Sequence, residues 1–224
     1  MKREFDLIIF DLDGTLYQVN NEMDRVYPRA TIHLLARKTG RDSREIEPEF
    51  LRKKDELQVI LNGQPTSTLT LLYFYDVGFE EFEDTIDSMI EVDKYIKPDA
   101  KTIDTIRKIR EHYPLFLYTT NNSKVSDRIL NHLGLSELFP PEKRFTLSDA
   151  GKLELPRKEK LQFVKPGLRG FAHILQMHSV NPDRVLMVGD SETSDITPAQ
   201  RSGIHTYHIT NRISFYRLPE WLGV

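Results

Sequence analysis

The stretch LIIFDLDGT, residues 7–15, decides the fold of this chain. Its first four residues are apolar, and the segment Asp11-Leu12-Asp13-Gly14-Thr15 follows them at once. A short apolar run that ends in polar residues is typical of a strand buried on both faces of a parallel sheet. Ligands in such sheets bind beyond the carboxyl ends of the strands, so the two aspartates lie where a site is expected.

Three further runs repeat this pattern along the chain. Leu115 to Tyr118 and residues 185–188 are each followed by polar or small residues, and residues 206–209 are read as a fourth strand. Amphipathic helical patterns lie between these runs, for example after Gly167. Strands that alternate with helices predict an α/β fold, a Rossmann-like doubly wound parallel sheet with helices on both faces.

Residues 18–95 break this alternation, because they contain no buried-strand run and helical patterns dominate. We interpret them as a helical domain inserted after the first strand, with residues 1–17 and 96–224 forming the α/β core. Within the insert, residues 76–93 hold eight acidic residues and no lysine or arginine, as expected of a solvated helix face. In the core, the charged residues 142–160 are expected to form a loop or hairpin.

Composition limits the class of protein. The chain has 224 residues, 39% apolar and 29% charged, which suits a globular protein with a sizeable core. A net charge of -3 and the lack of a long apolar run argue against a nucleic-acid polymer or a membrane as partner. The absence of cysteine excludes a disulfide framework, a thiolate zinc site and a cysteine nucleophile. We expect a cytoplasmic protein, since residues 1–5 lead into a strand rather than a signal-peptide core.

A second acidic group follows the run at residues 185–188. Asp190 leaves the end of that strand, and Asp195 lies five residues further on. Taken alone, these residues suit a helix N-terminus equally well. Carboxylates from two strand ends would repel one another at close range, and a hard divalent cation such as Mg²⁺ removes that repulsion. The sequence therefore predicts a magnesium ion among these acids.

Two polar groups complete the set. Thr119, Thr120 and Asn121 follow the run Leu115 to Tyr118, where hydroxyls and backbone amides can donate to phosphate oxygens. A cap on the next helix explains them equally well. Lys165 precedes a helical pattern, and a lysine considered by itself is usually a solvated surface residue.

In their order and spacing, these four groups resemble the motifs of the haloacid dehalogenase-like superfamily of hydrolases. The resemblance covers nearly the whole chain, and the insert is similar to the cap of the subgroup whose cap follows the first motif. It implies a Mg²⁺-dependent phosphatase that hydrolyses a small-molecule phosphomonoester through an aspartyl phosphate. Some features look most like the nucleotidase-type phosphatases, notably the pyrimidine 5'-nucleotidase-like branch. Gly189 departs from that branch, which often carries an acid there.

The resemblance also implies roles for the acids. Asp11 would attack phosphorus, and Asp13 would protonate the leaving alcohol and then accept a proton from water. The insert would close over the site, exclude water and contact the leaving group. The magnesium ion would be held by Asp11, Asp13 and Asp190.

The remaining motif residues would bind the phosphoryl group. Thr120 is preferred to Thr119 for this role, because the family usually places asparagine directly after the residue concerned, as Asn121 is here. Lys165 would share the phosphoryl oxygens with these groups. Asp195 would support Lys165 or a metal-bound water.

Three other functions are compatible with this fold. A dehalogenase needs a nucleophilic carboxylate but neither an acid at Asp13 nor a metal, so the residues present argue against it. A sugar phosphomutase would use the same core and return the phosphate to a sugar. A noncatalytic phosphate-sensing or partner-binding protein could also keep the fold, with residues 76–93 facing a basic partner.

Overall fold

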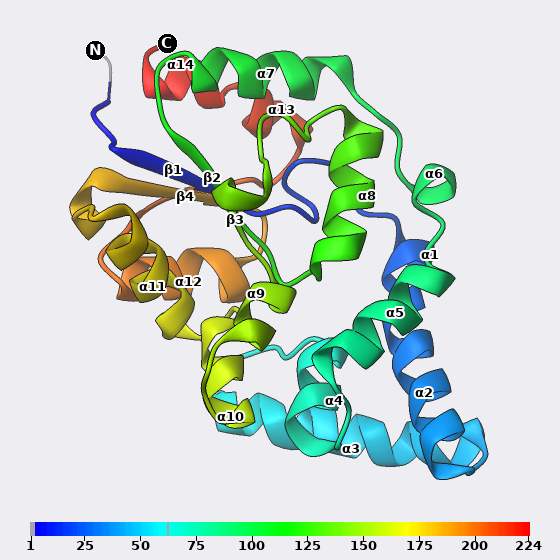
Figure 1. Cartoon of the computed structure of the whole chain (residues 1–224). Coiled ribbons are helices and arrows are strands. Elements are labelled where there is room, and N and C mark those ends of the chain that lie inside the picture. The colour runs from blue at the N-terminus through cyan, green and yellow to red at the C-terminus, as the bar shows by residue number, and fades with distance from the viewer. Residues whose placement is uncertain (1–2, 62) are drawn as a thin grey trace.

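The strand order in the sheet places one end of the first strand at a crevice. The computed structural model describes residues 3–61 and 63–224 (Figure 1). Its five strands are β1 (Leu7–Phe10), β2 (Leu115–Tyr118), β3 (Arg144–Phe145), β4 (Val185–Gly189) and β5 (His205–His208). All neighbours are parallel, in the order β3-β2-β1-β4-β5. From β1 the strand order runs toward one edge of the sheet through β2 and β3, and toward the other edge through β4 and β5. The switch point between β1 and β4 is where ligands bind in open α/β sheets.

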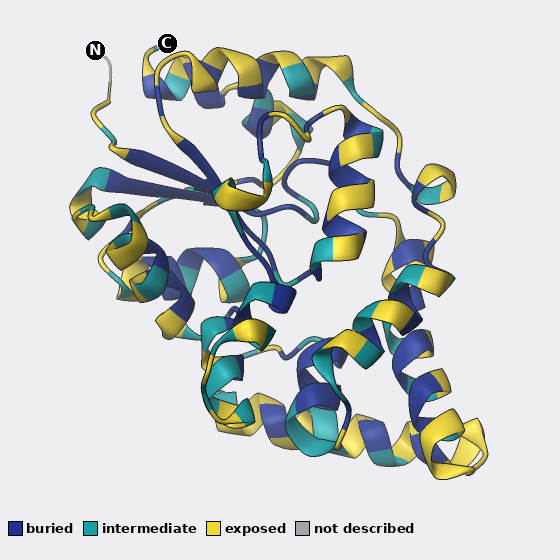
Figure 2. Cartoon of the chain, in the orientation of Figure 1, coloured by how far each residue is buried: buried dark blue, intermediate teal, exposed yellow. Residues whose placement is uncertain are grey.

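The central strands are buried because their side chains alternate between two apolar clusters (Figure 2). Ile8 and Phe10 belong to one cluster, and Leu7 and Ile9 belong to the other. Helices that cover the first cluster are α7 (Ala100–Arg110), α8 (Ser123–Leu133), α13 (Arg212–Tyr216) and α14 (Leu218–Leu222). The second is covered by α11 (Leu168–His178) and α12 (Thr197–Arg201). The predicted doubly wound α/β fold is therefore confirmed.

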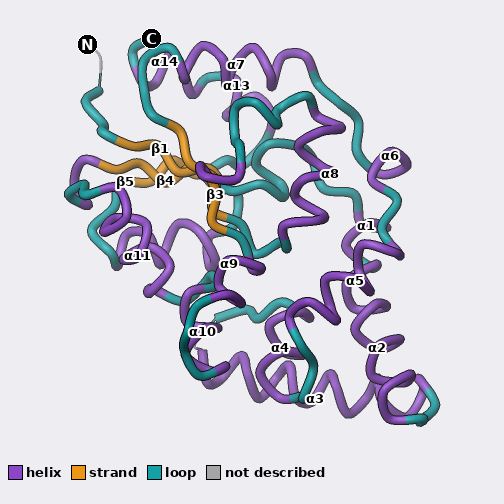
Figure 3. Tube along the Cα trace, viewed as in Figure 1, coloured by secondary structure: helices purple, strands orange, loops and turns teal. Residues whose placement is uncertain are grey.

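Between β1 and α7 the described residues contain helices and no strand (Figure 3). These helices are α1 (Asn21–Asp24), α2 (Val26–Thr39), α3 (Ser43–Leu61), α4 (Ser67–Phe74), α5 (Phe79–Met89) and α6 (Val92–Tyr95). Among the described residues, no helix combines the length and the apolar character that crossing a bilayer requires.

The prediction of a loop or hairpin at residues 142–160 is wrong. Residues Arg144–Phe145 pair with β2 as an edge strand, and α9 (Leu147–Lys152) and α10 (Arg157–Lys160) follow. The side chain of Thr146 accepts a hydrogen bond from the Asp149 backbone, and the Asp149 side chain accepts one from Thr146. This reciprocal cap starts α9, so a segment expected to be a loop begins a helix instead. The last strand lies one residue earlier than predicted.

The acidic residues 76–93 do more than face solvent. Asp84 forms an ion pair with Lys124 of α8, and Asp87 lies 3.1 Å from an Arg128 nitrogen one turn further along. The pairs join α5 of the insert to α8 of the core. Most of the eight acids are exposed, as expected of a solvated face, and these two also pair with basic residues of another element.

Candidate active site

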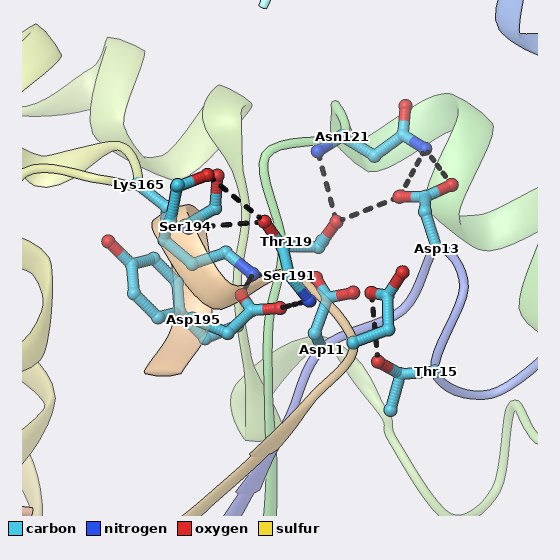
Figure 4. Close-up of polar contacts among 12 residues, drawn as sticks. Asp11, Asp13, Thr15, Thr119, Asn121, Lys165, Ser191, Ser194 and Asp195 are labelled. Atoms are coloured by element: carbon cyan, nitrogen blue, oxygen red, sulfur yellow. Dashed lines mark hydrogen bonds and ion pairs between the residues drawn. The ribbon is translucent and has the colours of Figure 1, made fainter. Parts of the chain in front are cut away.

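The carboxyl ends of β1 and β4 bring two acids to the crevice (Figure 4). Asp11 directly follows β1, and its backbone N–H donates to Val188 O at 2.9 Å. Asp190 directly follows β4. A Cβ at Gly14, whose φ is +83°, would lie 2.2 Å from an Asp190 oxygen. Only glycine suits this turn, both for its left-handed backbone and for the approach of Asp190.

Lys165 lies between two buried aspartates. Its Nζ is 2.6 Å from Asp11 Oδ1 and 2.5 Å from Asp195 Oδ1, and its side chain is only 2% exposed. Burial lowers the pKa of Lys165, but the charges of Asp11 and Asp195 reverse this effect and hold it above its usual value. Asp195 also accepts a hydrogen bond from Ser191 N at 3.1 Å. The lysine is thus held as a cation against the side chain of Asp11.

Asp13 is held by a separate set of donors. Asn121 Nδ2 donates to both of its oxygens, at 3.0 and 3.1 Å, and the Thr119 hydroxyl lies at 3.4 Å. The Tyr17 hydroxyl donates to Asp13 as well. Tyr27 of the insert donates to Asn121 Oδ1 at 2.8 Å, which fixes the asparagine with its NH₂ toward Asp13. A residue of the insert therefore orients a side chain that holds an acid of the core.

The pKa values of three of the acids are raised. Burial raises the pKa of Asp11 well above its usual value, and Lys165 offsets only part of this rise. Burial also raises the pKa of Asp13, against the hydrogen bonds that lower it. Burial, followed by the charge of Asp195, raises the pKa of Asp190 to about 6. Four carboxylates share one lysine here, so the site lacks positive charge.

This shortage fits a hard divalent cation. Oxygen atoms of Asp11, Asp190 and Asp195 lie within 4.8 Å of one another. The Asp190 side chain accepts a hydrogen bond from the Thr15 hydroxyl at 3.4 Å and forms no ion pair with a basic side chain in the described part of the chain. Carboxylate oxygens are the ligands that Mg²⁺ prefers. The Asp13 carboxylate faces Asn121, outside this cluster, which leaves its backbone carbonyl for the predicted role at the metal.

A pocket of about 320 Å³ opens beside Asp13. Thr120 and Asn121 line it from the core. The structure separates the two threonines, since the Thr119 hydroxyl faces Asp13 and accepts from Asn121 N at 3.0 Å, whereas Thr120 lines the pocket. The insert supplies the rest of the lining through Asp24, Tyr27, Pro28, Lys54, Thr66, Ser67 and Thr68.

Sequence reasoning gave no role to Tyr27 or Lys54. For Lys54 a signal exists, because it lies four residues after Phe50 and three before Leu57, on the face of α3 that is otherwise buried. For Tyr27 no signal exists in the sequence, because its partner Asn121 is 94 residues away.

Comparisons with known proteins identify the family and the fold. The family model of the haloacid dehalogenase-like hydrolases matches residues 5–203. A HAD phosphatase from Thermococcus onnurineus is similar in structure, with TM-score 0.56, 21% identity, and coverage of 97% of this chain and 98% of that one. A magnesium-bound HAD hydrolase from Bacillus subtilis gives TM-score 0.57 and 17% identity, covering 99% and 100%.

A 2-haloacid dehalogenase from Pseudomonas syringae gives TM-score 0.56 at 18% identity, covering 98% of both chains. At such identities the similar structures show the fold alone, and they include both phosphatase and dehalogenase names. The family model, in contrast, spans most of the chain and includes the strand-end acids. This chain therefore belongs to the haloacid dehalogenase-like hydrolases.

Proposed function

We propose that this hydrolase is a Mg²⁺-dependent phosphatase of small phosphomonoesters. The observation that carries the proposal is the separation of two neighbouring acids into different environments. Asp11 contacts Lys165, deep in the crevice, whereas Asp13 is held by neutral donors at the edge of a pocket. Two carboxylates in different environments suit a nucleophile and a proton donor. A dehalogenase has no use for an acid at Asp13.

The reaction follows from these positions. An Asp11 oxygen attacks phosphorus, and the bond from phosphorus to the ester oxygen breaks. Asp13, whose pKa is raised, gives its proton to the departing alkoxide. Water then attacks the phosphorus of the aspartyl phosphate and passes a proton to Asp13. The bond between phosphorus and the Asp11 oxygen breaks, which releases inorganic phosphate and regenerates Asp11. Bound Mg²⁺ would offset the repulsion between these carboxylates and the phosphate.

In this proposal the phosphoryl oxygens are bound by Thr120, Asn121 and Lys165. The hydroxyl of Thr120 forms no hydrogen bond within the described residues and faces the pocket, whereas that of Thr119 is already engaged. This favours Thr120 for the phosphate. Asn121 also positions Asp13, and Lys165 neutralises charge on Asp11. Residues 18–95 would act as the cap, and the lack of cysteine suits a cytosolic location.

Release of inorganic phosphate tests the proposal. The panel comprises an aryl phosphate, nucleoside monophosphates and sugar phosphates, each measured with Mg²⁺ and with a chelator. We expect Mg²⁺-dependent release from the wild type, and a loss of about 10³-fold or more in Asp11→Asn, which keeps the shape and removes the nucleophile. Near-normal turnover by Asp11→Asn would overturn the mechanism. An isomerised sugar phosphate without free phosphate would identify a mutase.

A further inference from the structure

The pocket beside Asp13 has two walls of different character. Asp13 and Thr120 line it from the core, where the phosphoryl group would be handled. Helices α3 and α4, in the lower part of Figure 1, supply Lys54, Ser67 and Thr68 on the other side. A phosphomonoester whose phosphate lies at the core wall must direct its leaving group toward this second wall.

Lys54 occupies a position that is otherwise apolar. Phe50 and Leu57, four residues before it and three after it, are buried on the same face of α3. The ammonium group of Lys54 makes no hydrogen bond or ion pair with any described residue. The adjacent Lys53 differs, since its Nζ lies 2.7 Å from Glu56 Oε2. A half-buried cation that lines a pocket and forms no ion pair is expected to attract an anion.

The start of α4 adds donors to the same wall. Ser67 and Thr68 are only 8% and 7% exposed, and their hydroxyls form no hydrogen bond with the described residues. Both line the pocket. The Thr66 side chain caps Leu69 N, and the other first N–H groups of the helix still favour negative charge. Two hydroxyls that line the pocket without a partner, beside a helix N-terminus and a lysine, form a site suited to an anion.

The charges along the pocket give the substrate a direction. Asp24 lies near Asp13, since partial burial and then the charge of Asp13 raise its pKa. Asp13 and Asp24 are thus the acidic residues that line the pocket, and Lys54 is the basic residue that lines it. We propose that the substrate bears a second anionic group, a carboxylate or a phosphate, bound by Lys54 and the N-terminus of α4. This inference rests on the proposed phosphatase function.

A nucleobase suits this pocket poorly. Tyr27 is the one aromatic side chain among the described residues that line it, and its hydroxyl is engaged by Asn121. Bases are usually held by stacking on aromatic rings. The second anion therefore favours small acidic phosphomonoesters over nucleoside monophosphates.

Matched substrate pairs test the second anion. One pair is 3-phosphoglycerate and glycerol 3-phosphate, which differ by a carboxylate. The other is propane-1,3-diol bisphosphate and 3-hydroxypropyl phosphate, which differ by a phosphate. We expect kcat/KM to favour the anionic member of at least one pair by about 10-fold or more, the effect of one charged hydrogen bond. The responding pair distinguishes a carboxylate from a phosphate, and AMP is expected to be poorer.

Two variants of α3 localise the effect. Lys54→Met keeps the apolar stem and removes the charge, so it should abolish the preference within the pair, while Lys54→Arg should retain most of it. Lys53→Met removes the neighbouring charge outside the pocket and should leave the preference unchanged. Equal kcat/KM within both wild-type pairs, or an equal loss for both members in Lys54→Met, would overturn the inference.

A binding measurement separates this inference from the phosphatase proposal. Calorimetric titration of the same pairs into Asp11→Asn protein reports affinity without turnover. Tighter binding of the anionic member, lost when Lys54→Met is added, would support the second-anion site even if the wild type released no phosphate from any substrate. Equal binding within both pairs would overturn it even if the aryl phosphate were hydrolysed.

Discussion

Tyr27 shows how a single hydroxyl of the insert reaches the chemistry of the core. Burial raises the pKa of Tyr27 well above its usual value, so the hydroxyl keeps its proton and donates to Asn121. Asn121 in turn donates to Asp13. If Asp13 protonates the leaving group, loss of the hydrogen bond from Tyr27 lowers turnover most for substrates whose leaving alkoxide is strongly basic.

We expect Tyr27→Phe to lower kcat by about 3- to 10-fold for an alkyl phosphate, as removal of one hydrogen bond suggests. With p-nitrophenyl phosphate, whose leaving group needs no proton, kcat should change less than about 2-fold. Tyr73→Phe serves as the control, because the Tyr73 hydroxyl has no hydrogen bond within the described residues. An equal loss with both substrates would mean that Tyr27 acts on structure rather than on the proton donor.

The acids of the site could be predicted from sequence, and the residues that tune them could not. Asp11 directly follows an apolar run and Asp190 follows one after a single glycine, and these runs mark the strand ends where ligands bind. Tyr27 depends on a contact between distant segments, and no local pattern encodes such a contact. Lys54 carried a weaker signal, a charge on an apolar helix face, which becomes informative only once the opposite wall is known.

At the scale of elements, α5 and α8 are joined by contacts of unequal strength. Arg128 donates to two carbonyls at the end of α5, Asp87 O at 2.8 Å and Ile90 O at 3.0 Å, besides its ion pair. Lys124 contacts Asp84 on the same pair of helices, where both side chains are about half exposed or more. Carbonyls at a helix end lack intrahelical partners, so Arg128 caps α5.

We expect Arg128→Met to lower the free energy of unfolding by about 1–2 kcal/mol and to speed hydrogen exchange in α5, because it leaves two carbonyls without a donor. Lys124→Met, the matched control, should cost less than about 1 kcal/mol, as exposed ion pairs do. Urea denaturation and exchange mass spectrometry measure both. Equal costs for the two variants would show that the cap contributes nothing beyond its charge.

Sequence patterns located these elements but not their partners. The acidic segment and the helix α8 were both visible, yet their pairing required the fold that brings residues 40 positions apart together. The edge strand β3 has only two residues, too few for any periodic signal, and it is defined by its neighbour β2. The central strands could be predicted because each is long enough to give an apolar run, whereas β3 is too short and depends on its pairing with β2.

At the scale of the whole molecule, the insert and the core share their apolar interior. Phe10 of the sheet and Leu34 and Phe50 of the insert belong to one buried cluster. Leu57 and Leu69 of the insert join the cluster on the opposite face, with Phe116 of β2. Two parts that share buried surface stabilise each other, although the chain order alone suggests separate domains.

We therefore expect the chain to unfold in a single transition. The sequence has one tryptophan, Trp221 of α14 in the core, whereas circular dichroism reports helices of both parts. The urea midpoints from fluorescence and circular dichroism should coincide. Leu34→Ala, a change in the insert that should cost about 2–5 kcal/mol, should shift both midpoints together. A loss of helical signal that precedes the fluorescence change would instead show that the insert unfolds by itself. Residues 18–95, which the sequence predicts to be a separate domain, would then also unfold as one.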